Sequence, residues 1–559
     1  MNILGKGLDP KFWEEAREKD CYARVRKDAL DMWEKDCQSP IISLPYSKFK
    51  MFWTTGDRSQ YESCYFRRRR ALCCCSVLSL LYPEESKYIE RLNDELFAVT
   101  EEYTWCLPAH HGKLDYNYEK MIDLFAAETA FTLSEIYTLL RHRLDPLVRN
   151  RIIAEVNRRV ITPYCERERE YGWETTTSNW AAVCMCSVAG AVMHIRPELF
   201  PELEPRFTAT MESYLSGFEE DGICLEGVGS WHYGFGFFAV YADMVRSFTD
   251  GRINYFERPL IKTISTFIQK MFLNGKACVS FADGHCGLTY HLGLVHRLKT
   301  EYPGDVLVYD PALSYNCDSC GRYCVFLRSF LWLDEDTYNN PNGAVEEVTY
   351  YAENSKWFVK KTPEYGFAAK AGHNGELHNN NDVGSFIFAK DGKQLLIDPG
   401  AGRYCRQYFG PERYTFIQTS SRGHNVPIIN GNYQKPGKSF SAKDVEVKDG
   451  VFTQDMAGAY GIEELKSLKR SFSFEGNTVY LKDEFNYVGE GNITERFVSN
   501  DKPEVLDGQI KIAGCTLYYD KAFTPVVSTA DAMKNNGSFY YLVDFVLPEG
   551  TKEFKVSFN

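Results

Sequence analysis

The stretch GHNGELHNNNDVGSFIFAKDGKQLLIDPG, residues 372–400, carries the signals that decide the fold of the C-terminal half. Its second part, Ser385–Asp398, is apolar on both sides of Asp391-Gly392, a residue pair that favours the type I′ turn of a two-residue β-hairpin. Its first part concentrates histidine, asparagine and aspartate, whose imidazole and oxygen atoms hold divalent metals or transfer protons. We therefore expect a β-hairpin whose neighbouring loop carries chemistry.

The same β pattern continues towards the C-terminus. Val445–Phe452 turns at Asp449-Gly450, Ser471–Leu481 turns near Gly476-Asn477, and further short alternating runs continue to Phe558. Upstream, Glu347–Val359 is also strand-like. These patterns predict an antiparallel β-sandwich over residues 343–559.

The N-terminal half has the period of helices instead. In Met121–Leu140 the apolar residues fall on one helical face. Further segments of this kind are Ala71–Leu81, Leu144–Val160, Asn179–Met193, Phe207–Phe218, Phe237–Phe248 and Leu260–Phe272. We expect serial helical hairpins over residues 1–335, followed by the polar linker Asp334–Asn342.

Composition narrows the class of protein. The chain has 559 residues and a net charge of −12, which argues against general nucleic-acid binding but leaves a local basic groove for an anionic substrate open. An aromatic share of 15% suits either a cleft whose aromatic rings bind sugars or a large hydrophobic core. We expect no membrane span and no signal peptide, because no long apolar run is present. The consecutive thiols Cys73–Cys75 indicate reduced cysteine and a cytoplasmic location.

Three residues of the β-half are candidate metal ligands. Asp398 ends a predicted strand, His424 opens another segment, and Asn380 lies in the loop before the hairpin. Oxygen and imidazole ligands suit Zn or Mn. The alternative is that Asp398 caps a turn and His424 packs in the sandwich. A half zinc site at Cys317, Cys320 and Cys324 has no second cysteine pair at suitable spacing.

The helical half offers three further candidate segments. The Gly-rich loop Asp221–Phe237 presents Glu226, Trp231, His232 and Tyr233, and a tyrosine there can act as acid or base if its pKa is lowered. The alternative is that Trp231 and Tyr233 are core rings. In Thr175–Trp180, Ser178 or Asn179 reads as a helix N-cap. Arg67–Arg70 is either a solvated helix face or a binding site for carboxylates and sulfates.

Taken in order, these motifs resemble a known family. IDLFAAETA (122–130), SNWAAVC (178–184) and EGVGSWHYG (226–234) precede HNGELHNNNDVGSF (373–386), LLIDPGAGRY (395–404), YFGPERY (408–414) and HNVPIING (424–431). This order resembles the heparinase II/III-like polysaccharide lyases, from about Tyr65 to Gly431. The resemblance implies an incomplete (α/α) toroid followed by an antiparallel β-sandwich. It also implies β-elimination on an acidic polysaccharide that contains uronic acid, with the substrate in a cleft between the two domains.

The resemblance also implies residue roles. Asn179 matches the amide that neutralises the uronate carboxylate, Tyr233 the tyrosine acid, and His378 the catalytic histidine. Asp398 and His424 match residues that hold a divalent metal, Mn or Zn, beside the site in some members. The residues expected to contact substrate are Arg68, Arg69, Trp173, Glu226, Trp231, His232 and His373.

One position departs from the family pattern. Many relatives carry a second histidine two positions after the catalytic one, where this chain has Asn380. Asparagine favours a harder ion than zinc. Two other functions therefore stay open. One is a glycoside hydrolase that uses two of the acids Glu128, Asp221 and Glu226, and the other is an inactive carbohydrate-binding protein.

Overall fold

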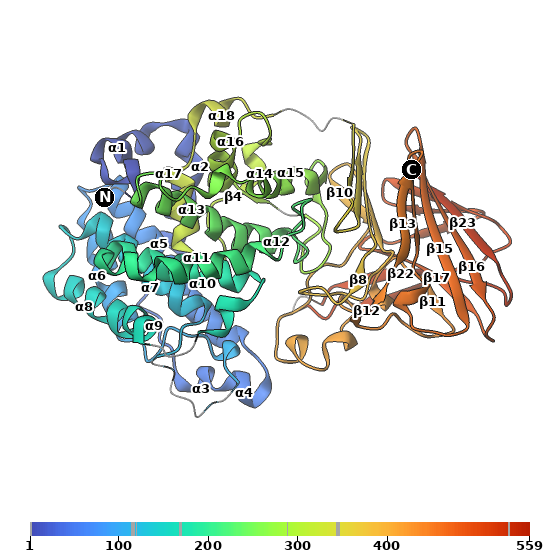
Figure 1. The fold of residues 1–559 in the computed structure, drawn as a ribbon, viewed down its shortest axis with the longest axis horizontal. Helices are drawn as coiled ribbons and strands as arrows, with labels where there is room; N and C mark the ends of the chain where they lie inside the picture. The colour runs from blue at the N-terminus through green and yellow to red at the C-terminus, as the bar shows by residue number, and fades with distance from the viewer. Residues whose placement is uncertain are drawn as a thin grey trace. The chain divides into compact units, whose positions relative to one another are not determined.

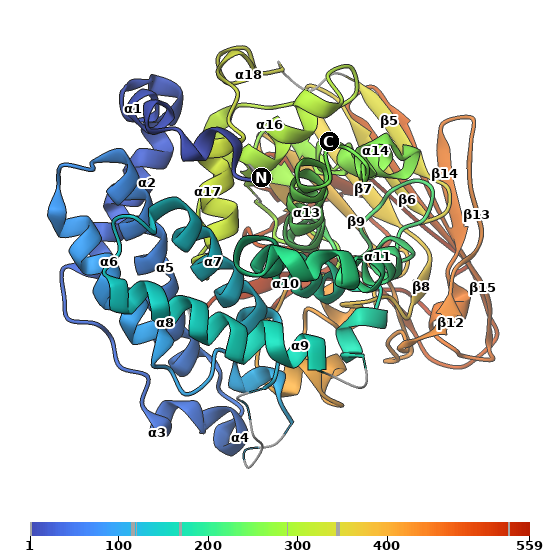
Figure 2. The ribbon, with the colours of Figure 1, turned by 60° about the vertical axis from the view of Figure 1, so that its left-hand side comes forward.

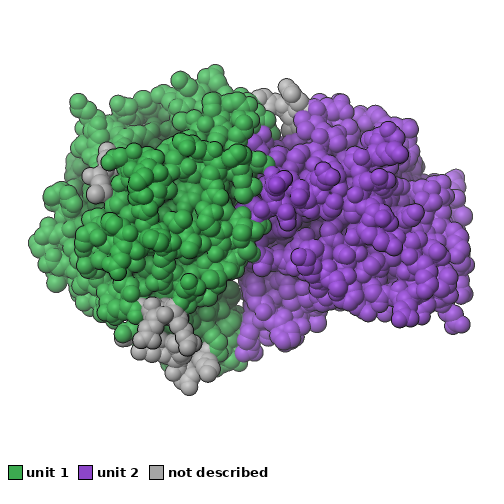
Figure 3. Space-filling model, in the orientation of Figure 1, with its two compact units in different colours: residues 1–217, 231–265, 290–342 green, residues 218–230, 266–289, 343–559 purple. Residues whose placement is uncertain are grey.

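The computed structural model describes residues 3–112, 114, 118, 120–166, 170–287, 289–342, 347–534 and 537–559. The chain forms two compact units, coloured separately in Figure 3. Unit 1 comprises Met1–Gly217, Trp231–Ser265 and Tyr290–Asn342, and unit 2 comprises Phe218–Ser230, Thr266–Thr289 and Gly343–Asn559. Two segments of the half predicted to be helical therefore group with the β-rich half.

Unit 1 is helical, as predicted (Figure 1). Its longer helices are α1 (Pro10–Glu18), α2 (Ala23–Met32), α5 (Ser59–Leu81), α6 (Ser86–Thr100), α7 (Leu124–Leu140), α8 (Pro146–Val156), α10 (Asn179–Ile195), α11 (Phe200–Leu215), α13 (Gly236–Phe248), α16 (Leu292–Glu301) and α17 (Tyr323–Leu331). Helix α10 packs against α7, α11 and α13 (Figure 2). Its small and apolar side chains are buried almost all round, which is typical of a helix enclosed by others.

Local chemistry explains where the predicted helices begin and end. Helix α7 begins at Leu124 because the Asp123 carboxylate accepts a hydrogen bond from the Ala126 N–H at 2.7 Å and caps the helix. The predicted helix Leu144–Val160 changes to a π-helical turn over Asn157–Ile161. The predicted helix Leu260–Phe272 is split into α14 (Pro259–Ser265) and α15 (Phe267–Met271).

Residues 272–342 contain elements that the sequence did not indicate. Four of them are short strands, β1 (Phe272–Asn274), β2 (Ala277–Cys278), β3 (Tyr290–His291) and β4 (Ser314–Tyr315). The predicted linker contains the short helix α18 (Glu335–Asn339). Among the described residues no single helix is long and apolar enough to cross a membrane. The pair Asn179–Ile195 and Pro197–Leu215, bent by 119°, meets that test only when both are taken together.

Unit 2 contains three larger sheets, and every strand pairing in them is antiparallel. The five-stranded sheet has the order β10 (Lys393–Leu396), β9 (Phe386–Lys390), β7 (Tyr365–Lys370), β6 (Trp357–Lys361), β5 (Val348–Ala352). The eight-stranded sheet has the order β13 (Lys443–Lys448), β14 (Val451–Asp455), β15 (Leu465–Glu475), β16 (Thr478–Tyr487), β23 (Glu553–Phe558), β20 (Cys515–Tyr519), β19 (Gln509–Ile512), β18 (Glu504–Leu506). The four-stranded sheet has the order β11 (Ile428–Ile429), β17 (Ile493–Ser499), β22 (Phe539–Val546), β21 (Pro525–Asp531).

The predicted turns are confirmed. β9 and β10 are joined by Asp391 and Gly392 with φ of 52° and 76°, and β13 and β14 by Asp449 and Gly450 with φ of 51° and 77°. Positive φ at both central residues is the requirement of a type I′ turn, which Asp-Gly meets at low cost. The helical first half and antiparallel second half thus have the fold class that the sequence predicted.

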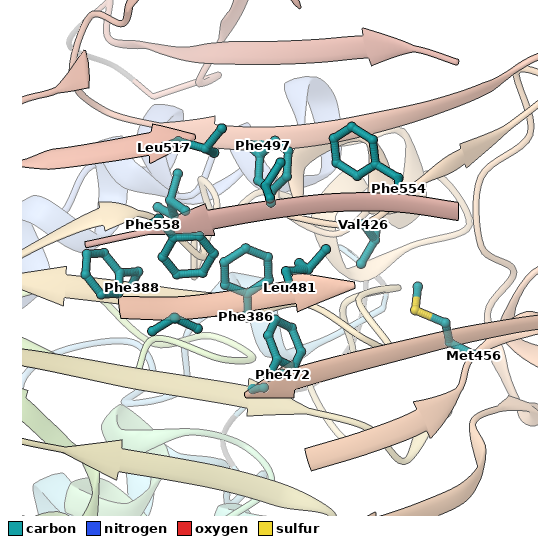
Figure 4. Packing of buried hydrophobic residues seen from close by; sticks show 14 of the residues in the cluster. Phe386, Phe388, Val426, Met456, Phe472, Leu481, Phe497, Leu517, Phe554 and Phe558 are labelled. Atoms are coloured by element: carbon teal, nitrogen blue, oxygen red, sulfur yellow. The ribbon is translucent and has the colours of Figure 1, made fainter. Parts of the chain in front are cut away.

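Aromatic side chains from all three sheets meet in one core (Figure 4). Phe386 is fully buried there, with its ring centroid 5.2 Å from that of Phe472 and 5.5 Å from that of Phe558. Removing such a ring costs about 3–5 kcal/mol of unfolding free energy. The loop before β9, which holds His378, is therefore attached to a strand of this buried core.

Candidate active site

In unit 1, Tyr233 lies in the π-helical turn η8 (Trp231–Phe235), directly before α13. A Cβ atom on Gly234 would lie 2.9 Å from both the Asn179 Cβ and the Tyr214 hydroxyl oxygen. Because only glycine fits this approach, η8 packs directly on the first residue of α10. The local fold therefore brings the residue next to Tyr233 against Asn179.

The Tyr233 hydroxyl contacts two charged side chains from other elements. It donates a hydrogen bond to Glu128 Oε1 of α7 at 2.5 Å. Arg322, which immediately precedes α17, places its Nε 3.4 Å from Glu128 Oε2. Its guanidinium carbon lies 4.0 Å from the centroid of the Tyr233 ring, a cation–π distance. Side chains from two other elements thus contact the Tyr233 phenol of η8.

The environment of Tyr233 keeps its proton on. Burial and the nearby Glu128 carboxylate raise the pKa of Tyr233 well above its ordinary value, and the opposing effect of Arg322 is smaller. Burial also raises the pKa of Glu128 to about 7, although Arg322 and the Tyr233 hydroxyl oppose the rise. The condition named for this tyrosine in the sequence, a lowered pKa, is therefore not met. A phenol of this kind is suited to donate a proton rather than to accept one.

Asn179 is the first residue of α10, and Ser178 occupies the cap position in an extended conformation without a capping hydrogen bond from its side chain. The Asn179 side chain is 8% exposed. The amide therefore lies at a helix N-terminus, where backbone N–H groups and the helix dipole favour a negative charge.

In unit 2, His378 lies between β8 (His373–Asn374) and β9 with a φ of 52°, a left-handed conformation that is uncommon for histidine. Its Nδ1 lies 2.5 Å from Asp283 Oδ2. The Asp283 carboxylate also accepts hydrogen bonds from the hydroxyls of Tyr404 at 2.7 Å and Tyr408 at 2.8 Å. Backbone strain held in place by such contacts is common at functional sites.

These contacts fix the protonation of the His378 ring. Burial alone would raise the pKa of Asp283. The hydrogen bond with His378 and the positive charges of His378 and Arg413 outweigh burial, so the pKa lies below its ordinary value and the group is a carboxylate. Nδ1 then carries the proton, and Nε2 lies 3.4 Å from Glu226 Oε2. Burial lowers the pKa of His378, yet Asp283 and Glu226 outweigh it and the net pKa is raised. This dyad makes Nε2 a stronger base.

The predicted metal residues Asp398 and His424 lie together, joined by Asp382. Their ligand atoms all lie within 4.8 Å of one another, and all three residues are buried. His424 Nε2 lies 2.8 Å from the Gln418 carbonyl, which can only accept, so Nε2 carries a proton. His424 Nδ1 faces Asp398 Oδ2 at 2.9 Å, a contact that needs either a second proton or a cation between the two atoms.

These side chains could hold a divalent cation, with Asp382 as a third candidate beside Asp398 and His424. Asn380 donates its side-chain N–H to the Ala282 carbonyl at 3.0 Å, and its Oδ1 is buried without a hydrogen-bond partner. Asn380 as a ligand stays a prediction. Lys370 already supplies one positive charge, with its Nζ 2.8 Å from Asp382 Oδ1.

Several residues predicted to contact substrate have structural roles instead. Arg69 is buried and forms a bidentate ion pair with Glu102 at 2.7 and 2.8 Å, and Arg68 contacts the same carboxylate at 3.1 Å. A guanidinium already paired and buried is not free to bind a sulfate. Arg69 therefore has a structural role, whereas a substrate role for the partly exposed Arg68 stays a prediction.

The two predicted tryptophans are core rings. Trp231 is fully buried and donates to the Ile264 carbonyl, and Trp173 donates to the Ile122 carbonyl, each at 3.0 Å. His232 is buried next to Trp231 and faces Tyr315 edge-on. For Trp231 the core interpretation is confirmed, and Trp173 is buried as well. His373 is half-buried and accepts a hydrogen bond from the Gly375 N–H at 3.1 Å, whereas Glu226 does lie at the His378 cluster.

The sequence analysis missed the partners that set the chemistry. Glu128 was considered only as a hydrolytic acid, and Arg322 and Asp283 were not considered at all. Tyr404 and Tyr408 stand in the quoted motifs LLIDPGAGRY and YFGPERY, but without a role. Asp283 stands in the turn-like stretch FADGH (281–285), which gives no local sign of its distance from His378.

Comparison with known proteins gives matches in structure only. A scan against protein-family models and a search of curated proteins find no match. A heparan sulfate lyase from Pedobacter heparinus matches with a TM-score of 0.59 at 11% identity, over 97% of this chain and 91% of that chain. A heparinase III matches with a TM-score of 0.59 at 12% identity, over 96% and 83%.

A third solved structure is a chondroitin AC lyase from Streptomyces coelicolor in complex with chondroitin sulphate. It matches with a TM-score of 0.56 at 10% identity, over 98% of this chain and 81% of that chain. The likeness extends over nearly the whole chain and agrees with the resemblance found in the sequence motifs. This protein has the fold of the heparinase III and chondroitin AC lyases, with a helical first half followed by antiparallel β-sheets.

Proposed function

We propose that this protein is a polysaccharide lyase that cleaves a uronic-acid-containing glycan by β-elimination. The proposal rests on one observation, the presence of both an acid and a base. The Tyr233 phenol of unit 1 keeps its proton, and the His378 imidazole of unit 2 is more basic than usual. Elimination needs one acid and one base of this kind. The structural neighbours are lyases of heparan sulfate and chondroitin, which supports an acidic glycosaminoglycan as substrate.

The proposed reaction has balanced steps. His378 Nε2 removes the C5 proton of the uronate, and the C5–H electron pair becomes part of the new C4=C5 double bond. The C4–O4 bond breaks, and the departing O4 takes the proton of the Tyr233 hydroxyl. The Asn179 amide at the N-terminus of α10 holds the uronate carboxylate while charge develops on it.

Two neighbouring carboxylates support this division of roles. Asp283 keeps the proton of His378 on Nδ1, so it is a positioning residue rather than a catalytic one. Glu128 receives the hydrogen bond of Tyr233 and, with a pKa of about 7, can return a proton to the phenolate after each turnover. Water enters no step, and the product carries a 4,5-unsaturated uronate at its new non-reducing end.

The cation proposed for unit 2 is Mn or Zn, held by Asp382, Asp398 and His424 Nδ1. Its contribution would be to bind the segments of these three residues together, next to the loop of His378 in sequence. Adding either ion to chelator-treated protein should raise the midpoint of thermal unfolding. The variant Asp398→Asn should abolish that rise, and an unchanged midpoint in the parent protein would remove the cation from the proposal.

The decisive experiment is a panel of uronate oligomers, heparan, chondroitin, hyaluronan and alginate, incubated with the protein. A lyase increases the ultraviolet absorbance, because the unsaturated uronate absorbs and the substrate does not. Mass spectrometry should find products whose masses sum to that of the substrate. Products heavier in sum by one water would instead identify a hydrolase.

The two alternative functions give different outcomes in the same panel. For hydrolysis, Asp221 is already committed, because its carboxylate accepts from the Asn354 N–H at 3.0 Å and from the Ser355 N–H and hydroxyl at 2.8 Å. An inactive binding protein would show affinity for a uronate oligomer without any product, even with added Mn. That result would overturn the lyase proposal.

A further inference from the structure

A second cluster of reactive side chains lies in unit 1, outside the candidate active site. Cys37 ends the π-helical turn η3 (Trp33–Cys37), and Cys74 and Cys75 lie in the middle of α5. The Cys37 Sγ is 3.5 Å from the Cys74 Sγ and 3.7 Å from the Cys75 Sγ. All three thiols are free and buried, with only Cys37 retaining a trace of exposure, 6%. We call these residues the cysteine trio.

The spacing of the three sulfurs matches a metal coordination sphere. A metal–sulfur bond of about 2.3 Å places the sulfurs of a trigonal site about 4.0 Å apart. The observed separations of 3.5 and 3.7 Å are within a few tenths of that value. Packed hydrophobic cysteines have no reason to converge in threes, since one sulfur gains as much from contact with carbon.

The donor set contains sulfur alone. The nearest carboxylate along the chain, Asp36, is committed to Arg70, which donates to its two oxygens at 2.8 and 3.2 Å. Among the described residues, the group of metal-binding side chains found here comprises only Cys37, Cys74 and Cys75. Three sulfurs without a fourth ligand suit a soft ion of low coordination number better than zinc, which takes four ligands in structural sites.

We propose that Cys37, Cys74 and Cys75 form a binding site for a monovalent thiophilic ion of the Cu(I) type. Each of the three thiols releases its proton to solvent as its sulfur joins the coordination sphere. The ion keeps its oxidation state and the cysteines keep theirs, so no oxidant or reductant is consumed. The site is independent of the proposed lyase activity.

The test is an anaerobic titration of the reduced, full-length chain with Cu(I), in competition with a chromogenic Cu(I) chelator. The parent protein should withhold one equivalent of ion from the chelator. Cys37→Ser should weaken the binding on the order of 100-fold, since it removes one of the three sulfur ligands. The matched control is Cys317→Ser. Cys317 is also a free thiol and interacts with the neighbouring Cys73, but it lies outside the trio.

Three results would overturn the site. They are no ion withheld by the parent protein, loss of binding in Cys317→Ser, and a tighter hold on Zn(II) than on Cu(I). If Cys37→Ser does not fold, as judged by circular dichroism, Cys74→Ala and Cys75→Ala take its place. X-ray absorption on the Cu(I)-loaded parent protein gives an independent answer. Three sulfur neighbours are expected, and two or fewer would contradict the trio.

Discussion

In the Tyr233 cluster of unit 1 and in the His378 cluster of unit 2, a side-chain ring contacts a buried carboxylate, and the pKa of that carboxylate shifts in opposite directions. Glu128 has one phenol donor and one arginine at 3.4 Å, so burial dominates and its pKa rises to about 7. Asp283 has three donors within 2.8 Å, and its pKa falls. The number of donors decides whether a buried carboxylate holds a proton or strengthens a base.

The largest expected effect is the loss of the acid. Tyr233→Phe keeps the ring and the cation–π contact with Arg322 but removes the only proton that the phenol can give. We expect kcat to fall by about 10²- to 10⁴-fold with little change in KM. Tyr241→Phe, a buried tyrosine of α13, is the matched control and should keep its rate. A Tyr233→Phe enzyme of near-normal rate would exclude this residue as the acid.

Weakening the base side should give a smaller effect with a distinctive pH signature. In Asp283→Asn the carboxylate charge that raises the pKa of His378 is gone. The base must be unprotonated to act, so the acid limb of the kcat profile should move to lower pH while the maximal rate falls about 10- to 100-fold.

Tyr404→Phe removes only one donor from Asp283 and should cost less than Asp283→Asn. A profile whose acid limb does not move in Asp283→Asn would show that His378 is not the titrating base.

A third change tests geometry without removing any reacting group. In Gly234→Ala the new methyl group meets the Asn179 Cβ and the Tyr214 hydroxyl at 2.9 Å, so η8 must shift relative to α10. We expect a loss on the order of tenfold in kcat, because Tyr233 and Asn179 lose their relative positions. Gly236→Ala, where the nearest atom lies at 3.6 Å, is the control and should be milder. Equal rates for the two variants would show that this approach does not position the site.

The smallest effect concerns stability. Glu128 has a folded-state pKa of about 7 against an ordinary value of 4.5, so the folded protein binds this proton more tightly than the unfolded chain. The associated stability is present at acidic pH and is lost as pH rises from 4.5 through about 7.

As pH rises over that range, the unfolding free energy of Glu128→Gln should therefore fall less than that of the parent protein. The difference between the two losses should be no more than about 3 kcal/mol. Chemical denaturation at several pH values measures the difference. Parallel curves for the two proteins would contradict the assignment of this proton to Glu128.

The sequence was sufficient for features that depend on short-range patterns. The Asp-Gly pairs at 391–392 and 449–450 determine their own turns, and the apolar face of 121–140 determines α7. It was insufficient wherever a side chain's role depends on a partner far along the chain. Nothing local shows that Arg69 pairs with Glu102, or that the proton on Tyr233 is held by a carboxylate 105 residues away.

The candidate site shows the same limit. The ring residues Tyr233 and His378 stand in recognisable motifs, whereas Glu128, Arg322 and Asp283 act only through tertiary contacts. Asp382 stands inside the quoted motif, but its position beside Asp398 and His424 depends on tertiary contacts that the letters do not show. The sequence motifs therefore located Tyr233 and His378, and the structure was needed to find the neighbouring groups that shift their pKa values.

The interleaving of the two units has a consequence for protein engineering. The chain passes between the units five times, and residues 218–230 and 266–289 belong with the sheets although they precede the linker. Cutting at the linker, the obvious place to separate two domains, would leave His378 without Asp283 and Glu226. The β-half therefore cannot be transplanted as a contiguous module. A chimaera that exchanges it must also exchange two insertions in the helical half, or its histidine will lose the partners that make it a base.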